Sequence, residues 1–146
     1  MNGYQEKSPE PDKKFKIVVS DTLRSKLDEI KTSITFKGIG AGEIDLVLRL
    51  GNNIGVAEVK SGNNALGKKG IDQLNTVAAP RFLGTYVAKI WIVDRHFPRD
   101  HNNYILAEKH NVKIIELPSF SDSCGNDLSE SDKGKLITEV IKILGG

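Results

Sequence analysis

Two neighbouring apolar segments in the first half of the chain carry charged residues among side chains that favour burial. The segments are EIDLVLRL, residues 43–50, and IGVAEVK, residues 54–60. Side chains alternate between the two faces of a strand, so Glu58 and Lys60 share one face and Asp45 shares its face with Glu43. Carboxylates and an amine that meet on one sheet face could bind a divalent cation and hydrolyse a phosphodiester.

The turn between these segments decides whether the charges meet. Residues 51–53, Gly-Asn-Asn, have a composition typical of a hairpin turn. A two-residue loop places Asp45 opposite Glu58 or Lys60, on the same side of the sheet. A symmetric three-residue loop would separate them, but such loops usually include a bulge that restores the match. We therefore expect Asp45, Glu58 and Lys60 to form a cluster with Glu43 at its edge.

Two carboxylates at hydrogen-bonding range repel each other and tend to retain a proton unless a cation joins them. Mg²⁺ or Mn²⁺ suits such a pair, because hard cations prefer oxygen ligands and keep bound water for hydrolysis. The alternative is a cross-strand ladder of ion pairs on an exposed sheet face. Spacing alone leaves both interpretations open. The glycine-rich residues 38–42 and the polar residues 61–64 favour a site, because they keep its approach open to a bulky substrate.

The other segments suggest how this hairpin is supported. Residues 1–14 are polar and charged with two prolines, and we expect them to form a flexible arm before a single domain over residues 15–146. Apolar spacing and turn residues predict helices over residues 20–34, 71–82, 99–111 and 130–146 and further strands over residues 33–38, 86–95 and 112–117. This order predicts an α/β fold: a mixed sheet, helices on both faces, and parallel pairing for the late strands.

Composition excludes several classes of protein. The 146 residues are 38% hydrophobic and 27% charged with a net charge of +2, as in an ordinary globular domain. One cysteine, Cys124, excludes an internal disulfide framework and a multi-cysteine zinc site. No apolar run approaches the ~20 residues that span a membrane, so we expect a cytoplasmic protein. Several basic residues form either a phosphate-binding rim or scattered solvated charge: Lys68, Lys69, Arg81, Arg95 and Arg99.

The pattern Asp45…Glu58-Val59-Lys60, with the predicted order of elements, resembles the PD-(D/E)xK nuclease superfamily. The resemblance covers roughly Asp21 to Leu117. The later part is most similar to the C-terminal nuclease domain of CRISPR-associated effectors that carry a cyclic-oligonucleotide-sensing (CARF) domain. It implies a restriction-endonuclease-like fold, an αβββαβ core followed by an extra αβ unit and a C-terminal helix. The sequence departs from the pattern at Ile44, where the superfamily has proline, and no sensing domain is present in this chain.

The resemblance also implies roles for individual residues. Asp45, Glu58 and the carbonyl of Val59 would bind Mg²⁺ or Mn²⁺, and Lys60 would orient the attacking water. Three residues are auxiliary candidates: Glu29, which would be the acid that many relatives place on the first helix, Glu43, and Gln73, which is otherwise a plain surface glutamine.

The implied activity is metal-dependent endonuclease cleavage of DNA or RNA in antiviral defence, by a homodimer that pairs with a sensing domain. The rival hypothesis is a non-catalytic nucleic-acid-binding or scaffold module with the same fold. The complete set of Asp45, Glu58 and Lys60 favours the enzyme, since a degenerate copy usually loses one member.

Overall fold

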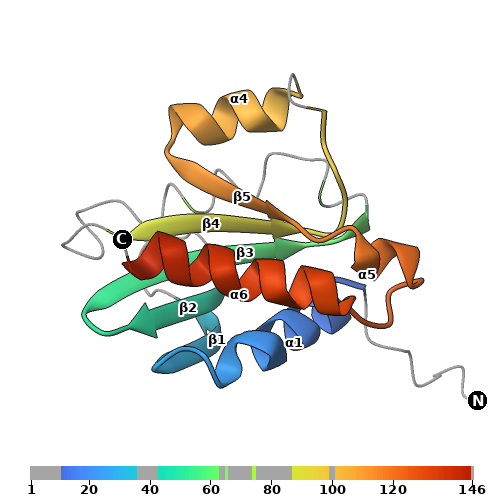
Figure 1. Cartoon of the computed structure of the whole chain (residues 1–146). Coiled ribbons are helices and arrows are strands. Elements are labelled where there is room, and N and C mark those ends of the chain that lie inside the picture. The colour runs from blue at the N-terminus through green and yellow to red at the C-terminus, as the bar shows by residue number, and fades with distance from the viewer. Residues whose placement is uncertain are drawn as a thin grey trace, which may run out of the picture.

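The computed structural model of the chain describes residues 11–35, 43–62, 65, 74, 87–98 and 101–145. Helices and strands follow one another along these residues as shown in Figure 1. Their bounds are α1 Pro11–Arg24, β1 Glu29–Thr35, β2 Glu43–Leu50, β3 Asn53–Lys60, β4 Ala88–Val93, α4 Asn102–Lys109, β5 Val112–Glu116, α5 Ser119–Asp122 and α6 Glu130–Gly145.

The described strands form one mixed sheet in the order β1-β2-β3-β4-β5. β1 pairs antiparallel with β2, and β2 pairs antiparallel with β3, as expected for strands joined by short turns. β4 is parallel to β3, and β5 is parallel to β4. The predicted mixed sheet and the predicted parallel pairing of the late strands are therefore confirmed.

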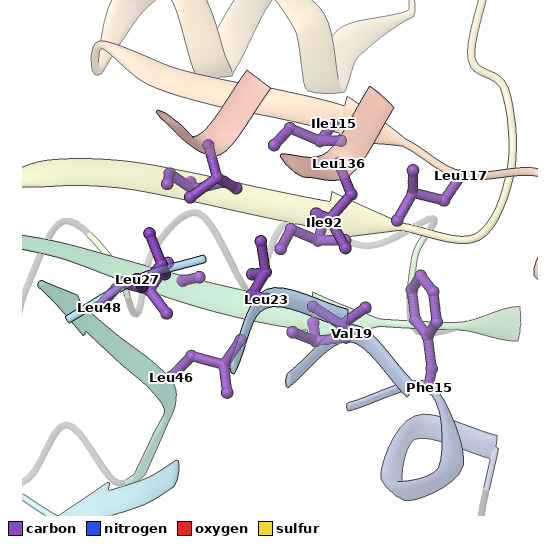
Figure 2. Close-up of a cluster of buried hydrophobic side chains, with 14 of the residues drawn as sticks. Phe15, Val19, Leu23, Leu27, Leu46, Leu48, Ile92, Ile115, Leu117 and Leu136 are labelled. Carbon is purple, nitrogen blue, oxygen red and sulfur yellow. The ribbon is translucent and has the colours of Figure 1, made fainter. Parts of the chain in front are cut away.

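Helices cover both faces of this sheet, as the sequence predicted. One face packs against α1 and α6, which lie side by side in front of the strands in Figure 1. Figure 2 shows Phe15, Val19 and Leu23 of α1 directed toward β-strand residues such as Leu46 and Ile92. The opposite face packs against α4 in a separate cluster that contains Trp91, Val56 and Ala107. Burying one such large side chain contributes about 1.5–3 kcal/mol, so the two clusters fix the sheet between its helices.

The first helix corrects the sequence prediction. α1 begins at Pro11, within the stretch predicted as a flexible arm, and ends at Arg24, whereas the predicted helix ran over residues 20–34. Strand β1 occupies Glu29–Thr35. The sequence predicted a helix over most of this range and a strand only from residue 33 onward. Ile30 and Ile34 misled the prediction, because a spacing of four residues returns to the same face in a helix and in a strand. Proline suits the first turn of a helix, where its missing N–H costs nothing.

The later elements agree more closely with the sequence. β4, α4, β5 and α6 lie within the predicted ranges, whereas the short α5 was not predicted. Leu136, Val140 and Leu144 form the buried side of α6. The predicted helix over residues 71–82 falls outside the described residues, apart from the buried Leu74. Among the helices that the structure describes, none has the length and apolar character needed to cross a membrane.

Two glycines provide a matched test of the backbone that holds the β2–β3 hairpin. Gly51 has φ +63°, and Gly134 lies inside α6; a Cβ added at either would meet no atom within 4 Å. We expect Gly51→Ala to lower the free energy of unfolding by about 1 kcal/mol, because a left-handed conformation disfavours a Cβ. We expect Gly134→Ala to raise it by about 0.5–1 kcal/mol, because alanine favours a helix interior. Urea denaturation measures both, and changes of equal sign would contradict this account of the turn.

Candidate active site

The β2–β3 turn places Asp45 and Glu58 face to face. Leu50 pairs with Asn53, so the loop contains two residues, the first being Gly51 with its positive φ. A glycine at the first loop position with a negative φ at the second is typical of a type II′ turn. The ladder continues to the pair Leu46↔Ala57, and the next positions along it are Asp45 and Glu58. The side chains of directly opposed residues lie on the same side of the sheet, as the two-residue loop predicted.

The backbone ladder between the two strands ends where these carboxylates meet. In a continued ladder, the N–H of Val59 would donate to the carbonyl of Ile44. Instead, the N–H of Val59 donates to Oδ2 of Asp45 at 2.8 Å. The Asp45 N–H lies 3.4 Å from Oε1 of Glu58. Side-chain oxygens thus take the place of a backbone acceptor, which holds both carboxylates at the point where β2 separates from β3.

Glu58 is the more buried of the two acids. It is 1% exposed, against 16% for the Asp45 side chain. Burial raises the pKa of Glu58, the neighbouring charge of Asp45 adds to the shift and Lys60 opposes it, and the pKa lies at about 8. The ammonium of Lys60 lies 3.5 Å from Oε2 of Glu58. The structure therefore brings Asp45, Glu58 and Lys60 together, with a carboxyl group that holds its proton near neutral pH.

A second lysine reaches the same cluster from helix α1. The Nζ of Lys16 lies 3.7 Å from Oδ1 of Asp45 and donates to Oγ of Ser33 at 2.6 Å. Only 17% of the Lys16 side chain is exposed. The sequence prediction missed this residue because the predicted first helix began nine residues after the observed start of α1 at Pro11. The apolar spacing of Phe15, Val19 and Leu23 was the available signal, since it predicts a helix that begins before Lys16.

The arrangement of helices and strands in the chain matches a known structure. The chain is similar to Can2 from Sulfobacillus thermosulfidooxidans, solved in complex with cyclic tetra-adenylate, with a TM-score of 0.60. The two sequences are 14% identical, and the match covers 90% of this chain and 35% of the Can2 chain. The chain has the restriction-endonuclease-like fold. This finding confirms the fold class expected from the sequence resemblance.

Two other solved structures match over a smaller part of the chain. A repair endonuclease from Pyrococcus abyssi is 19% identical, with a TM-score of 0.46 and coverage of 75% of this chain and 48% of that chain. EndoMS in complex with double-stranded DNA is 17% identical, with a TM-score of 0.45 and coverage of 78% and 47%. No protein-family model matches the sequence, and no curated protein matches it.

The donor atoms of the Asp45 and Glu58 cluster suit a hard divalent cation. Two carboxyl groups in contact, one of them kept protonated by its burial and by the charge of the other, would gain a favourable partner in a cation bound between them. The main-chain carbonyl of Val59 follows directly after Glu58 and supplies another oxygen. Within the described ranges, no group of three or more His, Cys, Asp or Glu side chains could hold a metal ion. A cation here would therefore depend on two carboxylates, backbone oxygen and water.

Of the auxiliary candidates from the sequence, Glu29 is the one whose side chain the structure describes, and it lies away from the cluster. Glu29 lies on β1, not on the first helix, and its Oε1 is 3.6 Å from Nε of Arg49 near the hairpin turn. Asp28 accepts the Gly51 N–H at 2.6 Å at the same end. The Glu43 backbone belongs to β2, while its side chain and the whole of Gln73 lie outside the described residues.

A buried acid fixes the chain just beyond Lys60. Oδ2 of Asp94 accepts the N–H of Gly62 at 3.2 Å, and Oδ1 lies 3.0 Å from Nε of Arg95. Asp94 is only 4% exposed, so these contacts hold the end of β3 against the end of β4. Of the basic residues considered for a phosphate-binding rim, Arg95 is the one that the structure describes.

The pKa of Glu58 predicts how the stability of the metal-free protein depends on pH. An unfolded chain releases this proton above the ordinary value of 4.5, whereas the folded protein keeps it to about pH 8. The folded state therefore binds the extra proton, and its stabilisation is lost as the pH rises through this window. We expect the melting temperature to fall by roughly 5 °C or more between about pH 5 and about pH 8.5 in chelator.

Glu58→Gln is the matched control, because glutamine resembles the protonated acid and does not titrate. This variant should lose the component of the pH dependence that Glu58 supplies, and it should melt above the wild type at the alkaline end. Melting curves with the same pH dependence in both proteins would contradict the raised pKa.

Proposed function

We propose that the chain is a metal-dependent endonuclease that hydrolyses phosphodiester bonds of DNA or RNA with Mg²⁺ or Mn²⁺. The observation that carries this proposal is the contact between Asp45 and Glu58 where β2 leaves β3, with the Lys60 ammonium 3.5 Å from Glu58. Two acids and an amine in this arrangement are the groups that hydrolysis at phosphorus requires. The restriction-endonuclease-like fold and the resemblance of Asp45…Glu58-Val59-Lys60 to the nuclease pattern support it.

Asp45, Glu58 and the Val59 carbonyl would bind the cation, which supplies Lewis acidity and lowers the pKa of a bound water. Asp45 is held for this task by the amide of Val59, so its carboxylate cannot rotate freely. Glu58 would have to release its proton to bind the cation, whose charge would offset the burial and the neighbouring Asp45 that raise the pKa of Glu58. Both acids would then be ionised where β2 separates from β3.

Lys60 has a different task from the two acids. Its ammonium lies beside Glu58 in the absence of substrate, with 20% of its side chain exposed. From this position it would orient the attacking water and stabilise the negative charge that develops on the phosphate oxygens. Preorganised charge of this kind acts mainly on the transition state, since it requires little reorganisation during the reaction.

The finer assignment is to an effector nuclease of a CRISPR-associated antiviral system. The likeness to Can2, solved with cyclic tetra-adenylate, supports this assignment, and so does the resemblance of the later sequence to nuclease domains of sensing effectors. The chain spans about a third of the Can2 chain, so we propose that it works with a separate or attached sensing domain. A cytoplasmic homodimer is the expected assembly.

The rival proposal is a module that binds nucleic acid or acts as a scaffold without cleavage. It requires only a positively charged surface, and it gives no reason for a buried acid beside a second acid. Burial of Glu58 in contact with Asp45 destabilises a metal-free protein at neutral pH, which a purely structural position would not need. The site geometry therefore favours the enzyme.

Lys60→Ala separates the two proposals. We expect the cleavage rate to fall on the order of 10²-fold or more, by analogy with the removal of one stabiliser of a developing anion. Affinity for nucleic acid should change little, because an interaction made mainly in the transition state appears in the rate. The assay uses labelled single- and double-stranded DNA and RNA with Mn²⁺ or with chelator.

Lys113→Ala is the matched control, because Lys113 is an exposed lysine on the edge strand β5. This variant should keep the wild-type rate. Cleavage by Lys60→Ala at the wild-type rate would remove Lys60 from the mechanism. The rival proposal would be favoured if the protein bound nucleic acid without metal and did not cleave it, and if Lys60→Ala weakened that binding.

A further inference from the structure

Helix α1 supplies the candidate site with a second ammonium group. The side chain of Lys16 reaches both β1 and β2, donating to Ser33 Oγ at 2.6 Å and pairing with Asp45 Oδ1 at 3.7 Å. We propose that Lys16 is a substrate-binding residue that contacts a nucleic-acid phosphate when a cation binds between Asp45 and Glu58. This inference rests on the proposed function, and it adds a residue that the nuclease pattern in the sequence does not contain.

The charges of the cluster explain why this contact depends on the cation. Lys16 pairs with Asp45, and Lys60 pairs with Glu58, so two ammonium groups flank two carboxyl groups. Among the side chains that the structure describes here, two ionised acids would balance the two ammonium groups. A divalent cation adds two positive charges and satisfies the carboxylates. The Lys16 ammonium then faces a like charge, and the oxygen of an incoming phosphate becomes its best partner.

Ser33 provides an anchor that does not depend on Asp45. The β1–β2 register pairs Thr32 with Leu46 and Ile34 with Ile44, and Ser33 between them has φ +55°. A serine rarely adopts this left-handed conformation, which glycine would accept more easily. The hydroxyl gives a physical reason for serine here, because it holds the Lys16 ammonium beside the cluster after the ion pair with Asp45 weakens.

A merely structural role for Lys16 makes the opposite prediction. If Lys16 only neutralised Asp45 or supported the fold, its removal would disturb the carboxylate and weaken the cation site and substrate binding together. If Lys16 is repelled by the cation and attracted by phosphate, its removal strengthens one interaction and weakens the other. Opposite signs in two binding measurements therefore identify the proposed role.

Calorimetry with Mn²⁺ gives the first measurement and needs no cleavage. We expect Lys16→Ala to bind Mn²⁺ roughly 5- to 10-fold more tightly than the wild type, because a neighbouring positive charge is removed. Lys16→Arg should restore the wild-type affinity for Mn²⁺. Lys26→Ala, which removes an exposed charge beyond the end of α1, should leave the affinity unchanged. Asp45→Asn, which keeps an acceptor for the Val59 amide but loses the charge, should abolish most Mn²⁺ binding.

Fluorescence anisotropy with labelled single- and double-stranded DNA and RNA oligonucleotides gives the second measurement. Ca²⁺ replaces Mn²⁺, since it binds the same type of oxygen ligand, and the probe is checked for integrity afterwards. We expect Lys16→Ala to lose on the order of tenfold in affinity, with a weaker dependence on salt because one phosphate contact is lost. In chelator, the loss should be much smaller, since Lys16 then stays paired with Asp45. Lys26→Ala should match the wild type.

Three outcomes would overturn the inference. Unchanged Mn²⁺ and oligonucleotide affinities in Lys16→Ala would do so while leaving the nuclease proposal intact, and a parallel loss of both affinities would assign Lys16 a structural role. A wild type that binds no Mn²⁺ would overturn the inference and the metal-dependent nuclease together.

If Lys16→Ala does not fold, Ser33→Ala provides a second test, because it keeps the Lys16 charge but removes the hydroxyl that anchors it. It should weaken oligonucleotide binding and leave Mn²⁺ affinity unchanged, and unaltered oligonucleotide binding would again contradict the inference.

Discussion

The bond from the Val59 amide to the Asp45 carboxylate is the contact on which the site depends. A regular hairpin would satisfy this amide with a backbone carbonyl and would continue past Asp45. A buried amide must find some acceptor, and the side chain provides one where the backbone of β2 turns away. The bond thus ends the ladder, fixes one carboxylate and leaves the other beside it. A cation bound between the carboxyl groups of Asp45 and Glu58 would allow both groups to ionise.

The remaining structure can be understood as support for this point of separation. Leu46, Ala57 and Val59 face α1 and α6, while Val56 faces the α4 side, so both sides of the hairpin are packed. The parallel strand β4 pairs with the other edge of β3, which carries Glu58. Glu58 therefore has packed strands and helices around it and little contact with solvent. The raised pKa of Glu58 follows from that position, because burial and the neighbouring charge of Asp45 disfavour the ionised form more than Lys60 favours it.

The hairpin and its acids were predictable because their information is local. A two-residue turn beginning with glycine sets the register, and alternation along each strand then places Asp45 and Glu58 on one face. The burial of Glu58 was not predictable, because it depends on β4 and on helices distant in sequence. Lys16 was missed because the predicted helix began at residue 20, although the spacing of Phe15, Val19 and Leu23 would have extended it past Lys16. The same spacing of four residues continues at Ile30 and Ile34 and predicted a helix over β1. Pairing with β2 decides the conformation there.

A crystal of the protein soaked in Mn²⁺ and recorded for anomalous scattering would test the central claim most directly. We predict an anomalous peak between the carboxyl groups of Asp45 and Glu58, at metal–oxygen distances of about 2.1 Å, with the Val59 carbonyl within reach. Crystals of Asp45→Asn soaked in the same way should lack the peak. An ordered wild-type site without anomalous density, with Lys16 and Lys60 still paired to Asp45 and Glu58 at saturating Mn²⁺, would contradict the account.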